Sequence, residues 1–257
     1  MKRYCYSILL LFSFAAMALG NSLLSRAQGS SGHTAPVELV SRPISSEEAN
    51  GMPKGTEDYE GPVPGTESYE NFSGALFIGD SRTAGLSEYG DLGEAEIFAN
   101  SGMSVFNVFE AGVKGKSGEK MSLEELLADN SYQNIYVMLG INELGYEFSS
   151  IVKKYQDTVE KIKRLQPSAA IVLEANLHVT QEQSAKSPIY NNENIDALNQ
   201  EIKKIAESMD CTYIDINEVF DDSDGNLADE YSFDGSHVLG KYYAVWTEWL
   251  KESLISL

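Results

Sequence analysis

From Phe72 to the C-terminus, short apolar runs alternate with longer amphipathic segments. The apolar runs cover residues 75–78, 96–99, 135–139, 170–175 and 212–214. Runs of this length, separated by helical patterns, are typical of βα units, in which helices join parallel strands and cover the sheet. The sequence therefore predicts one α/β domain over residues 72–257, a three-layer α/β/α sandwich around a parallel five-stranded sheet.

Apolar side chains recur at helical spacing between these runs and again at the end of the chain. Three such faces consist of Val152, Tyr155, Val159 and Ile162, then Ile195, Leu198, Ile202, Ile205 and Met209, and finally Tyr242, Val245, Trp246, Trp249 and Leu250. Because a helix buries its apolar stripe against its neighbours, we expect the first two of these helices to cover the sheet, and the third face marks a terminal helix. Ser122 and Glu125 have the spacing of a capping box, which predicts the start of a further short helix.

Residues 1–27 have the layout of a secretory signal. Lys2 and Arg3 precede an apolar stretch that ends near Leu19, and small residues follow. We expect cleavage after Gly20 or Ala27, with retention as an uncleaved membrane anchor as the alternative. The predicted location is extracellular or at the cell surface.

Residues 28–71 differ in composition from the rest of the chain. This segment is rich in Gly, Ser, Pro, Thr and Glu and lacks helical or strand periodicity. Such a composition does not bury enough apolar surface to offset the entropy of ordering the chain. It predicts a disordered acidic linker between the signal and the domain.

The charge balance and the cysteine count exclude several classes of function. The 39 acidic residues outnumber the 19 basic ones and give a formal net charge of −20, which repels polyanions, so no nucleic-acid partner is expected. Of the two cysteines, Cys5 lies in the signal segment, so we predict no disulfide framework and interpret Cys211 as a buried apolar residue.

The run 221–226 does not fit an EF-hand and is interpreted as a solvated turn. With no metal or nucleotide motif present, we expect neither a metal nor another cofactor.

Polar residues follow directly after several of the predicted strands. Ser81 follows the first, Gly102 the second, Asn142 and Glu143 the third, and His178 the fourth. The carboxyl ends of parallel strands share one edge of a sheet, so these residues should line one crevice. The segment Asp234-Gly235-Ser236-His237 precedes the terminal helix and adds a histidine and a carboxylate.

These residue types together suit nucleophilic catalysis. A serine hydroxyl needs a base to take its proton, and His237 could supply it while Asp234 fixes the tautomer of the imidazole. His178 is the alternative base. The negative oxygen of a tetrahedral intermediate needs donors in place before the reaction, and the N–H groups of Ser81 and Gly102 and the amide of Asn142 are candidates.

The motifs, taken together and in order, resemble those of the SGNH hydrolases, also called the GDSL-like esterase and lipase family. The chain has GDS at 79–81, a glycine at Gly102, GxN at 140–142 and DxxH at 234–237. The resemblance spans roughly residue 72 to the C-terminus and implies a flavodoxin-like sheet with strand order 2-1-3-4-5. It also implies the nucleophile Ser81, the base His237 with Asp234, and an oxyanion hole made by Ser81, Gly102 and Asn142.

The chain departs from the family pattern at two positions next to these motifs. Glu143 stands where Asp commonly follows the Asn of the third motif, and Arg82 replaces the Leu of the name-giving motif. A cation in the first turn of a helix opposes the helix dipole, so Arg82 either pairs with a carboxylate of the protein or binds a substrate carboxylate. Arg82 and Glu143, together with His178 after the fourth strand, are candidate substrate-binding residues.

The sequence as a whole predicts an exported serine esterase that forms an acyl-enzyme on Ser81. The expected substrate is a small-molecule or glycan ester with a short acyl chain, such as an O-acetyl group on a carbohydrate. Two alternatives stay open: a non-catalytic surface module that binds carbohydrate on the same fold, and an O-acyltransferase that uses the same residues. The oligomeric state is not predicted.

Overall fold

The computed structural model describes residues 72–115 and 118–255. The predicted signal segment, 1–27, and the predicted acidic linker, 28–71, lie outside the described residues, so both stay predictions.

Five parallel strands form the central sheet in the order β2-β1-β5-β6-β7. Their bounds are β1 Ala75–Gly79, β2 Glu96–Ala99, β5 Asn134–Met138, β6 Ala170–Glu174 and β7 Thr212–Ile214. When the five strands of this sheet are numbered 1 to 5 along the chain, their order across the sheet is 2-1-3-4-5. The predicted fold class, the five strands and their order are thus confirmed.

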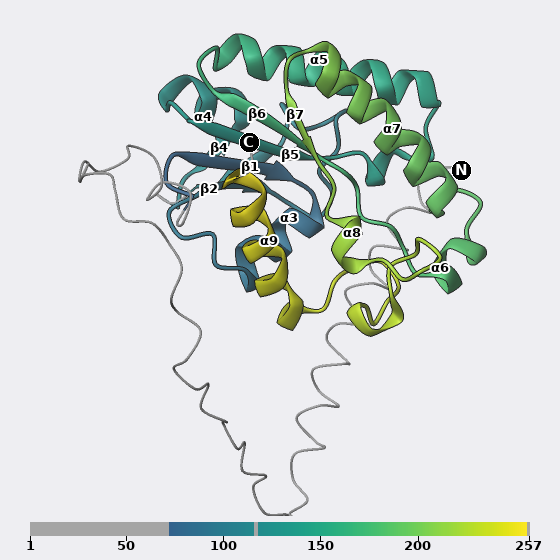
Figure 1. Cartoon of the computed structure of the whole chain (residues 1–257). Helices are drawn as coiled ribbons and strands as arrows, with labels where there is room; N and C mark the ends of the chain where they lie inside the picture. The colour runs from purple at the N-terminus through teal and green to yellow at the C-terminus, as the bar shows by residue number, and fades with distance from the viewer. Residues whose placement is uncertain (1–71, 116–117, 256–257) are drawn as a thin grey trace, which may run out of the picture. The chain divides into compact units, whose positions relative to one another are not determined.

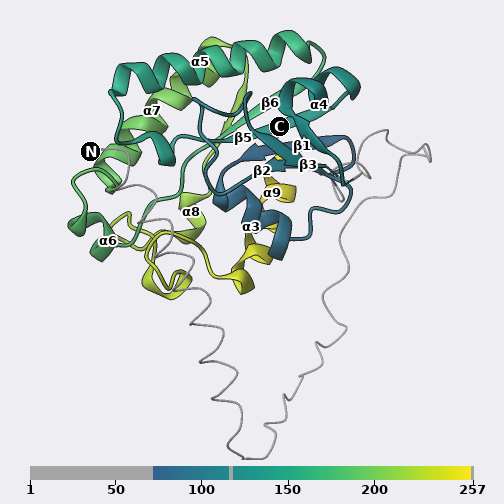
Figure 2. The same ribbon diagram turned by 180° about the vertical axis from the view of Figure 1, so that it is seen from behind.

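Helices cover both faces of the sheet, which makes the three predicted layers (Figure 1). One face carries α4 (Leu123–Asp129), α5 (Phe148–Leu165) and α7 (Asn192–Ser208). The other carries α3 (Ser81–Tyr89), α8 (Asn217–Phe220) and α9 (Tyr243–Ile255), as the view from behind also shows (Figure 2). Shorter elements at the loops are α6 (Gln181–Lys186), η1 (Ile141–Glu143), η2 (Asp229–Tyr231) and η3 (Gly240–Tyr242).

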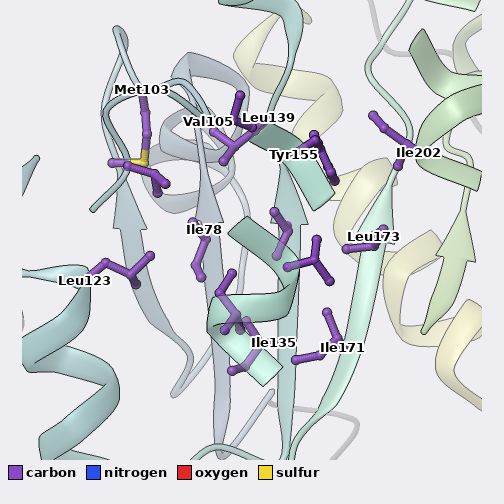
Figure 3. Packing of buried hydrophobic residues seen from close by; sticks show 14 of the residues in the cluster. Ile78, Met103, Val105, Leu123, Ile135, Leu139, Tyr155, Ile171, Leu173 and Ile202 are labelled. Carbon is purple, nitrogen blue, oxygen red and sulfur yellow. The ribbon is translucent and has the colours of Figure 1, made fainter. Parts of the chain in front are cut away.

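Alternate residues of each strand enter two separate apolar cores. In β1, Leu76 and Ile78 pack with the core under α5 and α7, whereas Phe77 packs with the core under α3 and α9. Figure 3 shows the first core, in which Ile78, Ile135 and Leu173 from three strands lie together. On the other face, the rings of Phe77 and Tyr136 stack with their centroids 4.3 Å apart. Burial on both faces explains why the strands are continuous apolar runs.

The predicted helices are present. The capping box is confirmed, since Ser122 Oγ accepts from the Glu125 N–H and the Glu125 carboxylate accepts from the Ser122 N–H. The predicted terminal helix is present, and within it Val245 is 45% exposed whereas Trp246 and Leu250 are buried. Cys211 is half-buried rather than fully buried.

A two-stranded antiparallel sheet of β3 (Gly112–Lys114) and β4 (Lys120–Ser122) was not predicted. Its strands have three residues each and lack an apolar run. Among the described residues, no helix is both long and apolar enough to cross a membrane.

Candidate active site

Ser81 is the first residue of α3 and directly follows the tight turn at the end of β1. A Cβ at Gly79 would lie 2.0 Å from Thr83 Oγ1 and 2.8 Å from the carbonyl oxygen of Met138, so the turn requires glycine. Asp80 caps the helix, because its Oδ1 accepts from the Arg82 N–H at 2.9 Å. These constraints place the Ser81 hydroxyl at the N-terminus of a helix, where the dipole favours negative charge.

A continuous chain of hydrogen bonds links the three predicted catalytic side chains. Ser81 Oγ lies 2.9 Å from His237 Nε2, and His237 Nδ1 lies 2.8 Å from Asp234 Oδ2. Since Nδ1 faces a carboxylate, it carries the proton, and Nε2 is then free to accept the proton of the serine. The structure therefore places Ser81, which lies 156 residues before His237 in the sequence, against the His237–Asp234 pair in the geometry of a catalytic triad.

The turn that carries His237 also fixes Asp234. Its Oδ1 accepts from the N–H groups of Ser236 and His237, both at 2.9 Å. Burial acts to raise the pKa of Asp234, but the hydrogen bond and charge of His237 and these two amides hold that pKa well below its usual value. Asp234 consequently stays ionised opposite the imidazole.

Ser232 is a supporting residue that the sequence analysis missed. Its hydroxyl donates to the His237 carbonyl oxygen at 2.8 Å and accepts from the Gly235 N–H at 2.9 Å. The same hydroxyl lies 3.3 Å from Asp234 Oδ1. Its position two residues before Asp234 was the available signal, since serine often bonds the backbone of a following turn.

The predicted oxyanion donors follow neighbouring strand ends. Gly79 of β1 pairs with Ala99 of β2 on one side and with Met138 of β5 on the other. Ser81, as the first helical residue, has an N–H without an intrahelical acceptor. Asn142 donates one amide hydrogen to the Met103 carbonyl oxygen at 2.8 Å, which leaves its second amide hydrogen for a ligand.

Gly102 differs from the expectation in one respect. Its N–H already donates to Asn100 Oδ1 at 3.0 Å, so it points at a side chain and not into an open site. A Cβ at Gly102 would meet only Asn100 Oδ1, at 3.9 Å. The protein's own packing therefore does not require glycine here.

Arg82 is a structural residue in this fold. It is only 2% exposed, its guanidinium lies 3.9 Å from the Asp80 carboxylate, and it donates to the Ser236 carbonyl oxygen at 3.3 Å. It thereby ties the start of α3 to the loop that carries His237. Of the two roles considered for Arg82, the geometry favours pairing within the protein over binding a substrate.

Glu143 is buried as well, and its carboxylate accepts from the Val105 N–H. Burial raises the pKa of Glu143 to about 8, and the nearby charge of Asp80 adds to the rise although the bond from Val105 opposes it. This hydrogen bond holds the loop after β2 in place. Because the Glu143 side chain is fully buried, the structure speaks against the expected contact with substrate.

Glu174, at the end of β6, is a second buried carboxyl that the sequence analysis missed. It is 2% exposed, and burial raises its pKa to about 8, with a smaller contribution from the charge of Asp80. Its place at the end of an apolar run gave no sign of this environment. Asp80, Glu143 and Glu174 are thus three buried carboxyl groups, and the charge of Asp80 contributes to the raised pKa of the other two.

His178 lies between two carboxylates and not beside Ser81. Its Nδ1 is 2.8 Å from Asp221 Oδ2, and its Nε2 is 3.0 Å from Asp196 Oδ1. Although burial acts to lower the pKa of His178, the hydrogen bonds and charges of the two aspartates raise it above its ordinary value. With both ring nitrogens engaged, His178 is not the catalytic base, and its burial speaks against contact with substrate.

The segment after β6 connects this histidine to the triad. The Val179 N–H donates to Asn192 Oδ1, and the Thr180 N–H donates to the Gly235 carbonyl oxygen at 2.9 Å. Thr180 therefore links the segment after β6 to the turn that contains Asp234.

The described residues contain no group of three or more His, Cys, Asp or Glu side chains that could hold a metal ion. The acidic run at 221–226 forms a hydrogen-bonded turn, in which Asp222 Oδ1 accepts from the Asp224 and Asn226 N–H groups.

The fold and the hydrogen-bonded Ser81, His237 and Asp234 define a serine hydrolase. Residues 77–245 match the GDSL-like Lipase/Acylhydrolase family, and the chain belongs to this family. Family membership makes the protein an enzyme that hydrolyses ester bonds, an acylhydrolase.

Solved structures of similar fold agree with this assignment. A protein from Streptococcus pneumonia described as a candidate platelet activating factor is 20% identical, with a TM-score of 0.57 over 74% of this chain and 90% of its own. A GDSL-like lipase from Bacteroides thetaiotaomicron is 15% identical, with a TM-score of 0.55 over 71% and 87%. A third, the acetyl xylan esterase AlAXEase, is 14% identical, with a TM-score of 0.50 over 71% and 98%. At these identities the likeness shows the fold, and no curated protein sequence matches the chain significantly.

Proposed function

We propose that the protein is an exported serine esterase that removes short acyl groups, such as acetyl, from the hydroxyl groups of carbohydrates. The observation that carries the esterase mechanism is the hydrogen-bonded chain from Ser81 through His237 to Asp234. No part of this chemistry needs a cofactor.

The reaction would proceed through an acyl-enzyme. Ser81 Oγ attacks the ester carbonyl while His237 Nε2 takes the serine proton, and Asp234 stabilises the imidazolium that forms. The imidazolium then gives its proton to the leaving alcohol oxygen, which breaks the ester bond. A water molecule, activated by the same imidazole, releases the carboxylic acid and restores Ser81.

The negative oxygen of each tetrahedral intermediate would be held by two donors that are in place. These are the Ser81 N–H at the start of α3 and the second amide hydrogen of Asn142. The Gly102 N–H becomes a third donor if the oxyanion replaces Asn100 Oδ1 as its acceptor.

Two observations support a short acyl group on a carbohydrate. Next to Asp234 lies a cavity with a mainly polar lining. In addition, an acetyl xylan esterase shares this fold.

The acyl preference is tested with p-nitrophenyl esters of increasing chain length. We expect kcat/KM to be highest for the acetyl ester and to fall steadily toward the decanoyl ester. A clear preference for the long chains would contradict the proposal.

Export is proposed from the sequence of residues 1–27, with Lys2 and Arg3 ahead of the apolar stretch. The test is to express the full chain in its native host and sequence the N-terminus of the mature protein. A start at Asn21 or Gln28 in the medium or cell-surface fraction supports the proposal. Intact protein found inside the cell contradicts it.

A further inference from the structure

An open cavity of about 330 Å³ lies beside the catalytic triad. One wall is the start of α6, with Thr180 and Gln183, and the other is the loop that runs from η2 to the triad. These two segments, distant in sequence, lie side by side in both views (Figures 1 and 2). Asp234 and Gly235 form part of the wall, so the cavity directly adjoins the catalytic machinery.

The two walls are joined by specific contacts. Thr180 donates its N–H to the Gly235 carbonyl oxygen at 2.9 Å, and its hydroxyl accepts from the Gln183 N–H. Gly235 has a φ of +79°, and a Cβ there would lie 2.8 Å from Thr180 Oγ1 and 2.9 Å from Gln183 Cβ. The close approach of the two walls therefore requires a glycine at position 235.

The lining combines polar groups with one exposed aromatic ring. Phe233, which directly precedes Asp234, is 76% exposed. Single exposed apolar residues are common on proteins, but this ring stands at a cavity next to a catalytic residue. Asp229 offers carboxylate acceptors, and Gln183 offers an amide with both donors and acceptors.

This combination suits a sugar ring better than the other classes of ligand. A pyranose has C–H faces that can lie on an aromatic ring and hydroxyl edges that bond to carboxylates and amides. An acyl chain would leave these polar groups without partners. An anionic ligand would meet the carboxylates of Asp229 and Asp234, because the lysine of the lining, Lys186, is paired with Glu182. The chemistry points to a neutral saccharide.

The position of the cavity indicates which part of an ester it would hold. In a serine esterase the imidazole protonates the leaving alcohol, so the alcohol part lies on the histidine side of the nucleophile. His237 and the cavity wall belong to the same loop, 229–237. A sugar chain that is esterified near Ser81 can thus extend along this loop into the cavity.

We propose that this cavity, whose lining includes Gln183, Asp229 and Phe233, is a subsite for a saccharide unit of the alcohol part of the substrate. This inference rests on the proposed esterase function and adds to it the residues that select the alcohol.

The test compares Phe233→Ala with the unchanged enzyme on two substrates. One is p-nitrophenyl acetate, whose alcohol part contains no sugar, and the other is an O-acetylated xylo-oligosaccharide. We expect Phe233→Ala to lower kcat/KM for the oligosaccharide at least tenfold, mainly through KM, and to change it less than twofold for p-nitrophenyl acetate. Tyr89→Ala is the control, because Tyr89 is also an exposed aromatic residue, 53% exposed, but lies at the far end of α3.

Direct binding gives a second, independent measurement. Isothermal titration calorimetry with Ser81→Ala, which leaves the ester intact, should detect the acetylated oligosaccharide. Addition of Phe233→Ala or Asp229→Asn should weaken that binding at least fivefold. Asp229 is exposed, so its substitution keeps the test valid if Phe233→Ala does not fold.

The outcomes separate the two proposals. If the enzyme cleaves neither substrate, the proposed function fails. If it cleaves p-nitrophenyl acetate but Phe233→Ala and Asp229→Asn leave oligosaccharide turnover and binding unchanged, the subsite is wrong while the esterase stands. An equal loss on both substrates would likewise contradict the subsite.

Discussion

At the scale of single residues, Asp234 has the best-defined electrostatic role in the site. It accepts from His237 Nδ1 and from two backbone amides, and its depressed pKa keeps it ionised through the neutral range. An imidazole held in this way presents an unprotonated Nε2 to Ser81. The triad therefore depends on a charge that the protein stabilises locally.

Asp234→Asn is expected to lower kcat on p-nitrophenyl acetate by roughly 10²- to 10⁴-fold, because an amide that donates to Nδ1 favours the wrong tautomer. The melting temperature should change little, since Asn keeps an oxygen for the two backbone amides. Asp224→Asn, in an exposed turn, is the matched control. A kcat within threefold of the unchanged enzyme would show that Asp234 does not orient His237.

Two glycines near the nucleophile should respond differently to alanine. Gly79→Ala places a Cβ 2.0 Å from Thr83 Oγ1 and against the Met138 carbonyl oxygen, so we expect a loss of about 1–3 kcal/mol in the free energy of unfolding. Gly102→Ala has room for its Cβ and should cost less than about 0.5 kcal/mol. Urea unfolding of both variants measures this, and equal losses would contradict the steric account of the turn.

The motifs in the sequence were sufficient to predict that Ser81, His237 and Asp234 lie in one hydrogen-bonded chain, because GDS and DxxH each fix residue types within one short turn. They could not predict that the Gly102 N–H donates to Asn100, or that Arg82 turns inward to Asp80 and Ser236. Those contacts depend on how separate loops approach one another. A local pattern carries no information about such contacts.

At the scale of elements, the register of the strands determines which loops lie together at the site. Gly79, Ala99 and Met138 lie next to one another across three strands, so the loops that follow emerge at the same edge of the sheet. Apolar runs predicted these strands, and strand ends predicted the shared crevice. The β3–β4 pair could not be predicted in this way, because each strand has only three residues and β4 is mostly polar.

The end of β6 carries a buried acid that should make stability depend on pH. Burial raises the pKa of Glu174 from 4.5 to about 8. Between these values the folded chain holds a proton that the unfolded chain releases. The free energy of unfolding is therefore highest below the unfolded pKa and falls as the pH rises toward the folded pKa, by up to about 1.4 kcal/mol per pH unit.

Glu174→Gln removes this proton linkage and should make the melting temperature fall less steeply between pH 5 and pH 8 than in the unchanged protein. Glu160→Gln, on the exposed side of α5, is the control and should leave the slope as it is. Differential scanning calorimetry at several pH values measures both. If the melting temperature of Glu174→Gln falls with pH as steeply as that of the unchanged protein, the pKa of Glu174 is not raised by folding and this account is wrong.

At the scale of the whole molecule, both apolar cores and the triad are built from residues 72 onward. A parallel sheet with helices on both faces presents its loops at one edge, and here those loops supply the proposed nucleophile, base and oxyanion donors. We propose that the polar cavity beside Asp234 contributes to the choice of ester.

The central claim is that Ser81 is a nucleophile activated by His237 and Asp234. It is tested most directly by treating the purified, folded protein with a fluorophosphonate probe and locating the adduct by mass spectrometry, since this reagent needs an activated serine. We predict a single adduct on Ser81, absent from Ser81→Ala and formed much more slowly in Asp234→Asn. The absence of an adduct on Ser81 in the folded protein, or labelling that persists in Ser81→Ala, would contradict the account.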